Sequence, residues 1–184
     1  TNYKRPILDV GCGFGEFSGV FFKSSVEMGI DISATDLIKA AQGRTYRRLY
    51  VEDARRLSFS QNSFATVVSI SVLEHIPQTD QAIREIYRVL KPGGFFIATV
   101  PTTDLYTCLF YPRLLEALGL KKLARWYFRL YNKAFKHINI WPKSTWENLV
   151  TQTGFKIIKS EKIISPTATK IFEIFLITSL PSQL

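Results

Sequence analysis

The segment Ile7-Leu8-Asp9-Val10-Gly11-Cys12-Gly13-Phe14-Gly15 decides the fold of this chain. Four strand-forming residues run into a cluster of three glycines, and Phe17, Val20 and Phe21 then recur at helical spacing. The segment therefore predicts a strand, a tight turn and a helix. Glycines suit the turn because the backbone must bend sharply there and let a ligand approach closely.

Strand and helix patterns continue to alternate as far as Pro101, which predicts an α/β fold with a doubly wound, mostly parallel sheet. Further strands are expected at 26–32, 48–51, 64–70 and 95–100, with helices after Ser33 and over 83–90. Near the C-terminus, a helix capped at Ser144 and closed by Gly154 precedes two more expected strands, near 155–164 and 171–178. Together these elements predict a seven-stranded sheet.

Length and composition favour one domain over 1–184, because 184 residues of which 46% are hydrophobic can bury one sizeable core. No stretch approaches the roughly 20 apolar residues that span a bilayer, and the first residues show no signal-peptide pattern. We therefore expect a soluble, cytoplasmic protein. Cys12 and Cys108 have no metal-ligand spacing, so neither a zinc site nor any other metal dependence is expected.

The glycine spacing is GxGxG, and Glu16 follows it where a dinucleotide phosphate would need free amides. The turn therefore disfavours a nicotinamide dehydrogenase. Asp31 ends the second expected strand, where a carboxylate can accept both hydroxyl protons of a ribose. Asp53 and Ala54 follow the third strand and could hold the adenine edge. The alternatives are a turn that serves only strand-to-helix geometry and an Asp31 that only caps a helix.

These segments, ILDVGCGFGEF, GIDIS, VEDARRLSF, FATVVSISVLEHI and REIYRVLKPGGFFIATVP, resemble the successive motifs of class I S-adenosylmethionine-dependent methyltransferases. The similarity covers roughly residues 7–101 and is greatest to the small-molecule and lipid methyltransferases with a VLEHI-type motif at strand four. It implies the Rossmann-like fold of that family, S-adenosylmethionine as cofactor and S-adenosylhomocysteine as product.

The resemblance also implies a role for each matching position. The methionine side of the pocket would be shaped by the glycine turn, the ribose and adenine would contact the ends of the second and third strands, and the sulfonium would lie over strand four. The implied cofactor-binding residues are Asp9, Gly11, Cys12, Gly13, Asp31, Ile32, Asp53, Ala54, Ser69, Ile70 and Ser71.

Methyl transfer from a sulfonium needs no protein nucleophile, because alignment alone can supply on the order of 7–11 kcal/mol. A base helps when the acceptor is a hydroxyl or a protonated amine. His75 is the first candidate for this catalytic role, and hydrogen bonding that closes its loop is the equal alternative. His137 is the second candidate, and its alternative is a surface or capping residue.

Residues 102–140 depart from the family pattern and are expected to form a helical acceptor-binding insertion after the fifth strand. One apolar stripe follows helical spacing from Leu120 to Ile138, and much of the chain's net charge of +9 lies on the other faces of the same stretch. We expect a basic helix over 111–138 that binds a small-molecule or lipid-like acceptor. Peripheral contact with an anionic membrane surface and a lid with a solvated basic face are the alternatives.

Two other functions are open at this point. The charge would suit a nucleic-acid methyltransferase, although strand four lacks the Asn/Asp-Pro-Pro-aromatic sequence of adenine amino-methylating enzymes and no RNA-binding module is visible. A catalytically silent protein that binds S-adenosylmethionine is also compatible with the fold.

Overall fold

The computed structural model describes residues 3–163, and these divide into two compact units. The first comprises residues up to Val100 together with Leu149–Phe155, and the second comprises Pro101–Asn148 and the residues from Lys156 onward. The expected insertion at 102–140 falls within the second unit.

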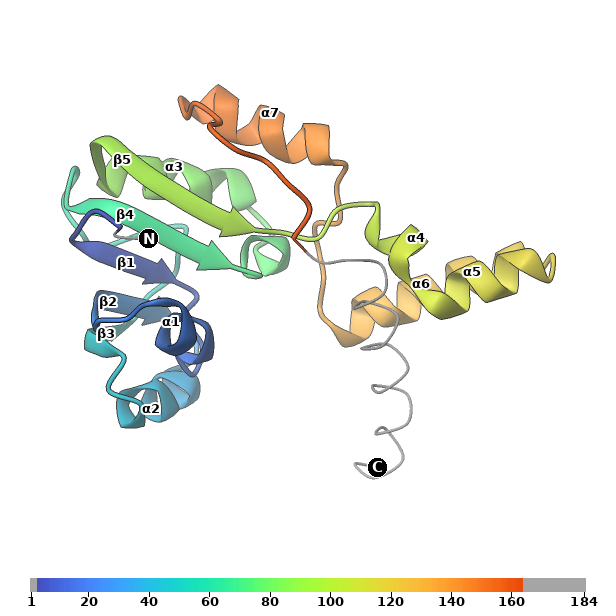
Figure 1. The fold of residues 1–184 in the computed structure, drawn as a ribbon, viewed down its shortest axis with the longest axis horizontal. Coiled ribbons are helices and arrows are strands. Elements are labelled where there is room, and N and C mark those ends of the chain that lie inside the picture. Colours follow the sequence, from blue (N-terminus) through green and yellow to red (C-terminus); the bar gives the residue numbers. More distant parts are fainter. Residues whose placement is uncertain (1–2, 164–184) are drawn as a thin grey trace. The chain divides into compact units, whose positions relative to one another are not determined.

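The first unit is built on a parallel five-stranded sheet with the order β3-β2-β1-β4-β5 (Figure 1). Its elements are β1 (Ile7–Val10), α1 (Glu16–Phe21), β2 (Val26–Asp31), α2 (Ala34–Gln42), β3 (Tyr46–Val51), β4 (Phe64–Ile70), the 3-10 turn η1 (Leu73–His75), α3 (Thr79–Val89) and β5 (Leu90–Thr99). Right-handed crossovers place α1 and α2 on one face of such a sheet and α3 on the other. The Rossmann-like prediction and the first five strands are confirmed.

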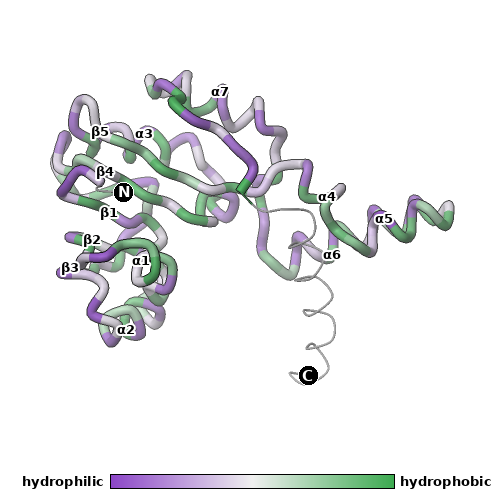
Figure 2. The backbone as a smooth tube through the Cα atoms, viewed as in Figure 1, coloured by the Kyte–Doolittle hydropathy of each residue, from purple (hydrophilic) through white to green (hydrophobic). Residues whose placement is uncertain are grey.

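The core of this unit lies around β1 and β4, which pair with each other at the centre of the sheet. Every residue of β1 is buried, as are the first six residues of β4. The helix α3 adds Ile83, Ile86 and Val89 to this core at helical spacing. Figure 2 shows apolar stretches along these central strands as well as on the helices.

The helix predicted after the glycine turn forms as α1, but its apolar side chains are exposed, since Val20 is 92% exposed and only Ser18 of this helix is buried. The predicted start of the fifth strand is wrong, because β5 begins at Leu90, directly after α3, and not at Phe95. Pro92 cannot continue α3, and the helix ends before it as expected. The extended backbone begins already at Leu90, which pairs with Phe64 of β4.

The helix α7 (Lys143–Thr153) ends at Gly154 as predicted, in a left-handed conformation with φ 111°. It begins one residue before Ser144, so Ser144 lies in its first turn and the predicted cap is wrong. Phe155 then packs edge-on against Tyr87 and beside Phe96, within the first unit.

Residues 155–163 form no strand, so the sheet prediction at 155–164 is wrong over these residues. Apolar side chains alone do not make a strand, because the backbone also needs a neighbouring ladder, and among residues 3–163 β5 pairs only with β4. The strand predicted at 171–178 lies outside the described residues. The sheet therefore has five strands over 3–163, where seven were predicted for the whole chain.

The second unit contains α4 (Leu105–Cys108), α5 (Phe110–Ala117) and α6 (Lys121–Ala134). The single basic helix predicted over 111–138 is wrong, because Gly119 takes a left-handed conformation with φ 77° and breaks it into α5 and α6. Tyr111 contacts Tyr127 with ring centroids 5.6 Å apart, so the two helices form a packed hairpin. Within 3–163, no helix has the length and apolarity required to cross a membrane.

Candidate functional site

The predicted cofactor residues of the first unit follow the carboxyl ends of four adjacent strands. Gly11 follows β1, Asp31 ends β2, Asp53 lies shortly after β3 and Ser71 follows β4. Parallel strands end at the same edge of a sheet, so the order β3-β2-β1-β4 brings these positions together. The strand order reverses between β1 and β4, and ligands of open α/β sheets bind at such a switch point.

The glycine turn after β1 is left-handed at three positions. Gly11, Gly13 and Gly15 have φ angles of 74°, 50° and 83°, a conformation that glycine adopts without the steric cost of a side chain. A Cβ atom on Gly11 would lie 2.4 Å from the methyl groups of Val72, whereas one on Gly13 would meet no atom within 4 Å. The turn is therefore packed against the protein at Gly11 and open at Gly13.

Hydrogen bonds anchor this turn to β2. The backbone amides of Gly11 and Cys12 both donate to the carbonyl oxygen of Ile30, at 2.8 and 2.9 Å. Cys12 itself is buried, and burial, followed by the charges of Asp9 and Asp31, raises the pKa of its thiol. The thiol therefore remains protonated and has a packing role.

Asp31 uses both of its carboxylate oxygens on backbone amides. Oδ2 accepts from the amide of Gly13 at 2.9 Å, and Oδ1 accepts from the amide of Ser33 at 2.8 Å. The helix α2 is capped by Ser33, whose Oγ accepts from the amide of Asp36. Asp31 is therefore not the cap of α2. Each carboxylate oxygen has more than one lone pair, so hydroxyl donors can still bind it.

Asp9 lies beneath the glycine turn and is only 4% exposed. Its Oδ2 accepts hydrogen bonds from Ser18 Oγ on α1 and from Tyr46 Oη on β3, each at 2.6 Å. Burial raises the pKa of this carboxyl group, while the two hydroxyl donors oppose the rise. Asp9 thus ties α1 and β3 to β1, and supports the turn from inside the protein.

Tyr46 was not identified from the sequence, although it shapes the turn. Besides donating to Asp9, its ring occupies the space that a Cβ atom on Gly15 or Gly29 would need. Asp9 and Tyr46 are 37 residues apart, and nothing in the local pattern of either residue indicates the contact.

Asp53 is engaged by Arg55, which donates from Nε to both carboxylate oxygens at 3.0 Å. This interaction holds the pKa of Asp53 below its ordinary value. Arg55 also donates to the side-chain oxygen of Gln78. The predicted adenine carboxylate is therefore charged and fixed in orientation, with Ala54 beside it and only partly buried.

The three predicted residues of strand four have different environments. Ser69 is fully buried, and its Oγ is one of only two buried side-chain oxygens without a hydrogen-bond partner among the described residues. Ile70 is partly buried. Ser71 has a left-handed φ of 54° and is held by Thr99, whose Oγ1 accepts from the Ser71 amide at 3.1 Å.

The other unpartnered oxygen is Oε2 of Glu74, a residue missed by the sequence reasoning. Glu74 is 2% exposed, and burial raises the pKa of its carboxyl group. Its Oε1 lies 3.9 Å from Nε2 of His75, whose side chain is 38% exposed. The imidazole of His75, the candidate base, is therefore partly exposed to solvent, and the neighbouring carboxyl group of Glu74 is buried.

His137 belongs to the second unit and closes the end of α6. Its amide donates to the carbonyl oxygen of Asn132, and its Nδ1 lies 3.1 Å from Oδ1 of the same residue. Its ring stacks on Phe135. These contacts match the capping alternative.

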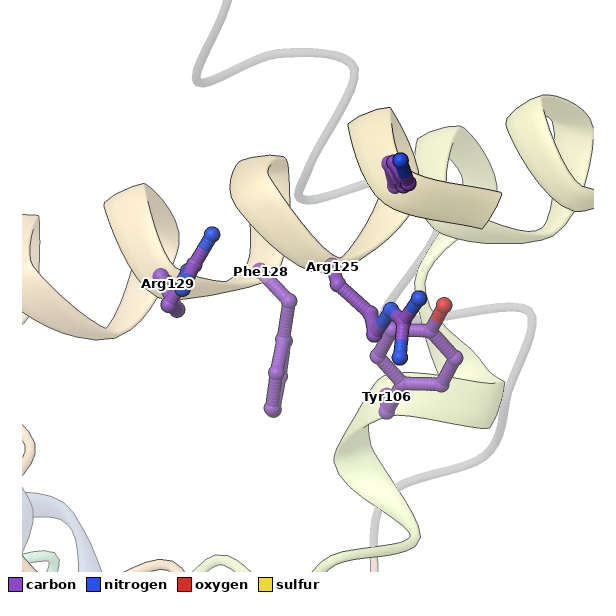
Figure 3. A pocket seen from close by; sticks show the side chains of 5 residues that line it. Tyr106, Arg125, Phe128 and Arg129 are labelled. Atoms are coloured by element: carbon purple, nitrogen blue, oxygen red, sulfur yellow. The ribbon is translucent and has the colours of Figure 1, made fainter. Parts of the chain in front are cut away.

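The second unit contains a basic and aromatic pocket of about 520 Å³ (Figure 3). It is lined by Tyr106, Lys122, Arg125, Phe128 and Arg129. The hydroxyl group of Tyr106 donates to Glu116 at 2.7 Å. The cations and rings of this pocket suit an anionic ligand that also has an apolar part.

Comparison with known proteins identifies the first unit. Residues 8–98 match the family model described as a methyltransferase domain. The chain is 38% identical over 97 residues to tRNA (carboxymethyluridine(34)-5-O)-methyltransferase of Arabidopsis thaliana, covering 51% of this chain and 23% of that protein. It is 33% identical over 98 residues to sterol 24-C-methyltransferase of Aspergillus fumigatus, covering 49% of this chain and 26% of that protein.

A solved structure extends the similarity in fold. Phosphoethanolamine N-methyltransferase 2 of Haemonchus contortus, in complex with phosphomonomethylethanolamine and S-adenosylhomocysteine, superposes with a TM-score of 0.58 at 23% identity. The match covers 84% of this chain and 34% of that one. This chain thus spans about a third of that protein and about a quarter of the two curated relatives.

Proposed function

The chain belongs to the class I S-adenosylmethionine-dependent methyltransferases through residues 8–98, and on this basis we propose that it transfers a methyl group from S-adenosylmethionine to a small-molecule or lipid-like acceptor. The product of the cofactor would be S-adenosylhomocysteine. The observation that carries the proposal is the open, left-handed glycine turn beside the fixed carboxylates of Asp31 and Asp53.

The residues at the switch point fit this cofactor. The space above Gly13 admits a ligand against the backbone, and Asp31 is oriented by two amides while it keeps lone pairs for the ribose hydroxyls. Ile32 is 72% exposed next to Asp31, where it can cover one face of an adenine ring. The buried, unpartnered Oγ of Ser69 supplies a polar atom under the methionine part.

When bound, S-adenosylmethionine supplies both the electrophilic methyl group and the leaving group. The chain has to hold the acceptor in line with the methyl group and exclude water. For a hydroxyl or protonated amine acceptor, the imidazole of His75 would take up the proton. The buried carboxyl group of Glu74, 3.9 Å away, would orient that imidazole.

The second unit is the proposed acceptor-binding part. Its pocket combines Lys122, Arg125 and Arg129 with two aromatic rings, which suits an acceptor with an anionic group and an apolar body. His137 is a weaker candidate for a second base, because its contacts with Asn132 and Phe135 give it a structural role.

Calorimetry tests the cofactor site, and transfer of a labelled methyl group tests the activity. The chain should bind S-adenosylmethionine and S-adenosylhomocysteine, and Gly13→Val should abolish binding because its side chain fills the open space. Transfer of label from S-adenosylmethionine into a lipid extract would support the lipid-like acceptor. Transfer into RNA would favour the nucleic-acid alternative, which the Arabidopsis relative represents. Binding without transfer to any fraction would indicate a silent protein.

A further inference from the structure

Three sectors divide the surface of α6. Ala124, Tyr127 and Tyr131 lie on its packed side, where Ala124 is buried and Tyr127 contacts Tyr111 of α5. At 100° per residue, a second sector carries an exposed apolar stripe, and a third sector next to it carries cations. The apolar stripe consists of Leu123, Trp126 and Leu130, and the cationic sector consists of Lys121, Lys122, Arg125, Arg129 and Lys133.

A second exposed apolar stripe runs along α5. Phe110, Leu114 and Leu118 recur every four residues, one helical turn apart, and are 36%, 42% and 64% exposed. Buried Pro112 lies on the opposite side of this helix, and the ring of Tyr111, beside the stripe, contacts Tyr127 of α6. The stripe therefore does not belong to the hairpin's own contact.

Helical geometry places the two stripes on the same side of the hairpin. The centre of each stripe lies roughly 60–70° from the Tyr111–Tyr127 contact at 100° per residue, and because α5 and α6 run in opposite directions, these offsets turn both stripes toward one face. We call this the apolar face, formed by Phe110, Leu114, Leu118, Leu123, Trp126 and Leu130. All six side chains are exposed. Exposed apolar residues on a soluble protein are usually scattered singly, so six of them on one face are unusual.

Cations border this face. Trp126 of the stripe lies next to the sector of Lys122 and Arg129, which also line the basic pocket. Glu116 is the only acid between residues 110 and 138, and it accepts a hydrogen bond from Tyr106. The face therefore combines exposed leucine and tryptophan side chains with an almost wholly positive border.

We propose that the α5–α6 hairpin lies in the interface of an anionic lipid bilayer. Leu123, Trp126 and Leu130, with the α5 stripe, would enter the boundary between headgroups and acyl chains, while Lys122, Arg125 and Arg129 would contact lipid phosphates. Charge complementarity favours an anionic bilayer as the partner of this face. An apolar protein surface could cover the leucine and tryptophan side chains, but it would not require the cations that border them. The proposal deepens the proposed function, since a membrane surface would bring a lipid-like acceptor to the second unit.

Flotation with vesicles of phosphatidylcholine, with and without phosphatidylserine, tests the proposal on the full chain. Binding should require phosphatidylserine and should weaken as salt is added. Lys122→Gln with Arg129→Gln should lower the partition coefficient roughly 25-fold, at about fivefold per cation. Leu130→Ser should lower it about tenfold or more. The matched controls Lys91→Gln and Ile38→Ser alter exposed residues of the first unit and should leave it unchanged.

Tryptophan fluorescence gives an independent readout. Trp141 and Trp146 pack on each other with ring centroids 4.7 Å apart, whereas Trp126 is half exposed on the apolar face. Anionic vesicles should therefore shift the emission to the blue, and Trp126→Phe should keep vesicle binding but lose the shift. A shift that persists in Trp126→Phe would overturn the proposed orientation.

Three further results would overturn the proposal. Binding that appears only when the chain is cut after residue 163 would mean that residues 164–184 cover the face. A dimer that Leu130→Ser dissociates would assign the face to a second copy. RNA binding that needs Lys122 and Arg129 but not Leu130, without vesicle binding, would assign the cations to nucleic acid. Calorimetry with S-adenosylmethionine on the same variants separates failure of the membrane proposal from failure of the proposed function. Cofactor binding without vesicle binding would overturn only the membrane proposal.

Discussion

The backbone amide of Gly13 donates a hydrogen bond to Oδ2 of Asp31 at 2.9 Å, which links the turn after β1 to the end of β2. The carboxylate thereby fixes the turn and remains available to a ligand. The geometry of the glycine turn and the proposed ribose contact consequently depend on one side chain.

Asp31→Asn should weaken binding of S-adenosylmethionine by about 10- to 100-fold, since an amide offers one acceptor oxygen where the carboxylate offers two. Calorimetry measures the change. Asp104→Asn alters an exposed carboxylate of the second unit and should bind normally. Equal affinity in Asp31→Asn and the unaltered chain would remove Asp31 from the site.

Alanine at Gly11 and at Gly13 should have different effects. Both positions have positive φ, which costs alanine on the order of 1–2 kcal/mol. At Gly11 the added Cβ also overlaps Val72, so the free energy of unfolding should fall further, by about 1–3 kcal/mol in addition. Gly13→Ala should remain folded but bind the cofactor less tightly. Urea unfolding and calorimetry distinguish the two; similar stability in both variants would contradict the packing at Val72.

The buried carboxyl group of Asp9 predicts a pH dependence of stability. Burial raises its pKa in the folded state above the ordinary 3.8, so its contribution to stability is complete below that value. The contribution is lost as the pH rises through the higher folded-state pKa. Asp9→Asn has no proton to release, so the unaltered chain should lose stability relative to this variant as the pH rises above about 4. Urea unfolding of both proteins across this range checks the difference.

Arg55→Gln should have the opposite pH signature. Arg55 lowers the pKa of Asp53 in the folded state, so the pair stabilises the fold above the ordinary carboxyl pKa and stops doing so as acid protonates Asp53. Both side chains are about one-third exposed, so solvent screening keeps the loss at neutral pH small. The difference in stability between variant and parent should shrink as the pH falls below about 4.

His75→Gln should lower kcat by about 100- to 10,000-fold if the imidazole is the general base, without changing affinity for S-adenosylmethionine. An unchanged kcat in His75→Gln would support the loop-closing alternative. Glu74→Gln should lower kcat by a smaller factor than His75→Gln if Glu74 orients His75.

Local patterns were sufficient to predict much of the first unit. The strands around β1 and β4, the glycine turn and the cap at Ser33 all follow from adjacent residues, and so does the grouping of residues at strand ends. The Asp53–Arg55 pair, two residues apart, was also visible in the sequence but was not used. The family resemblance supplied the cofactor.

The remaining features depend on contacts between distant parts of the chain. The apolar side chains of α1 follow helical spacing, but no other described element buries Val20. Ile157 and Ile158 read as a strand but find no ladder in the described part of the sheet. The break at Gly119 was overlooked because the apolar period continues on both sides of it.

The carbonyl oxygen of Ile30 holds the glycine turn in place in the absence of a ligand. Two successive amides, from Gly11 and Cys12, converge on this one carbonyl of β2, and β1 is bordered by strands on either side. Opening the turn at these residues would therefore break two hydrogen bonds at the end of a buried central strand, so this part of the turn should open rarely. An arriving nucleoside meets a preformed surface and spends no conformational entropy on ordering a loop.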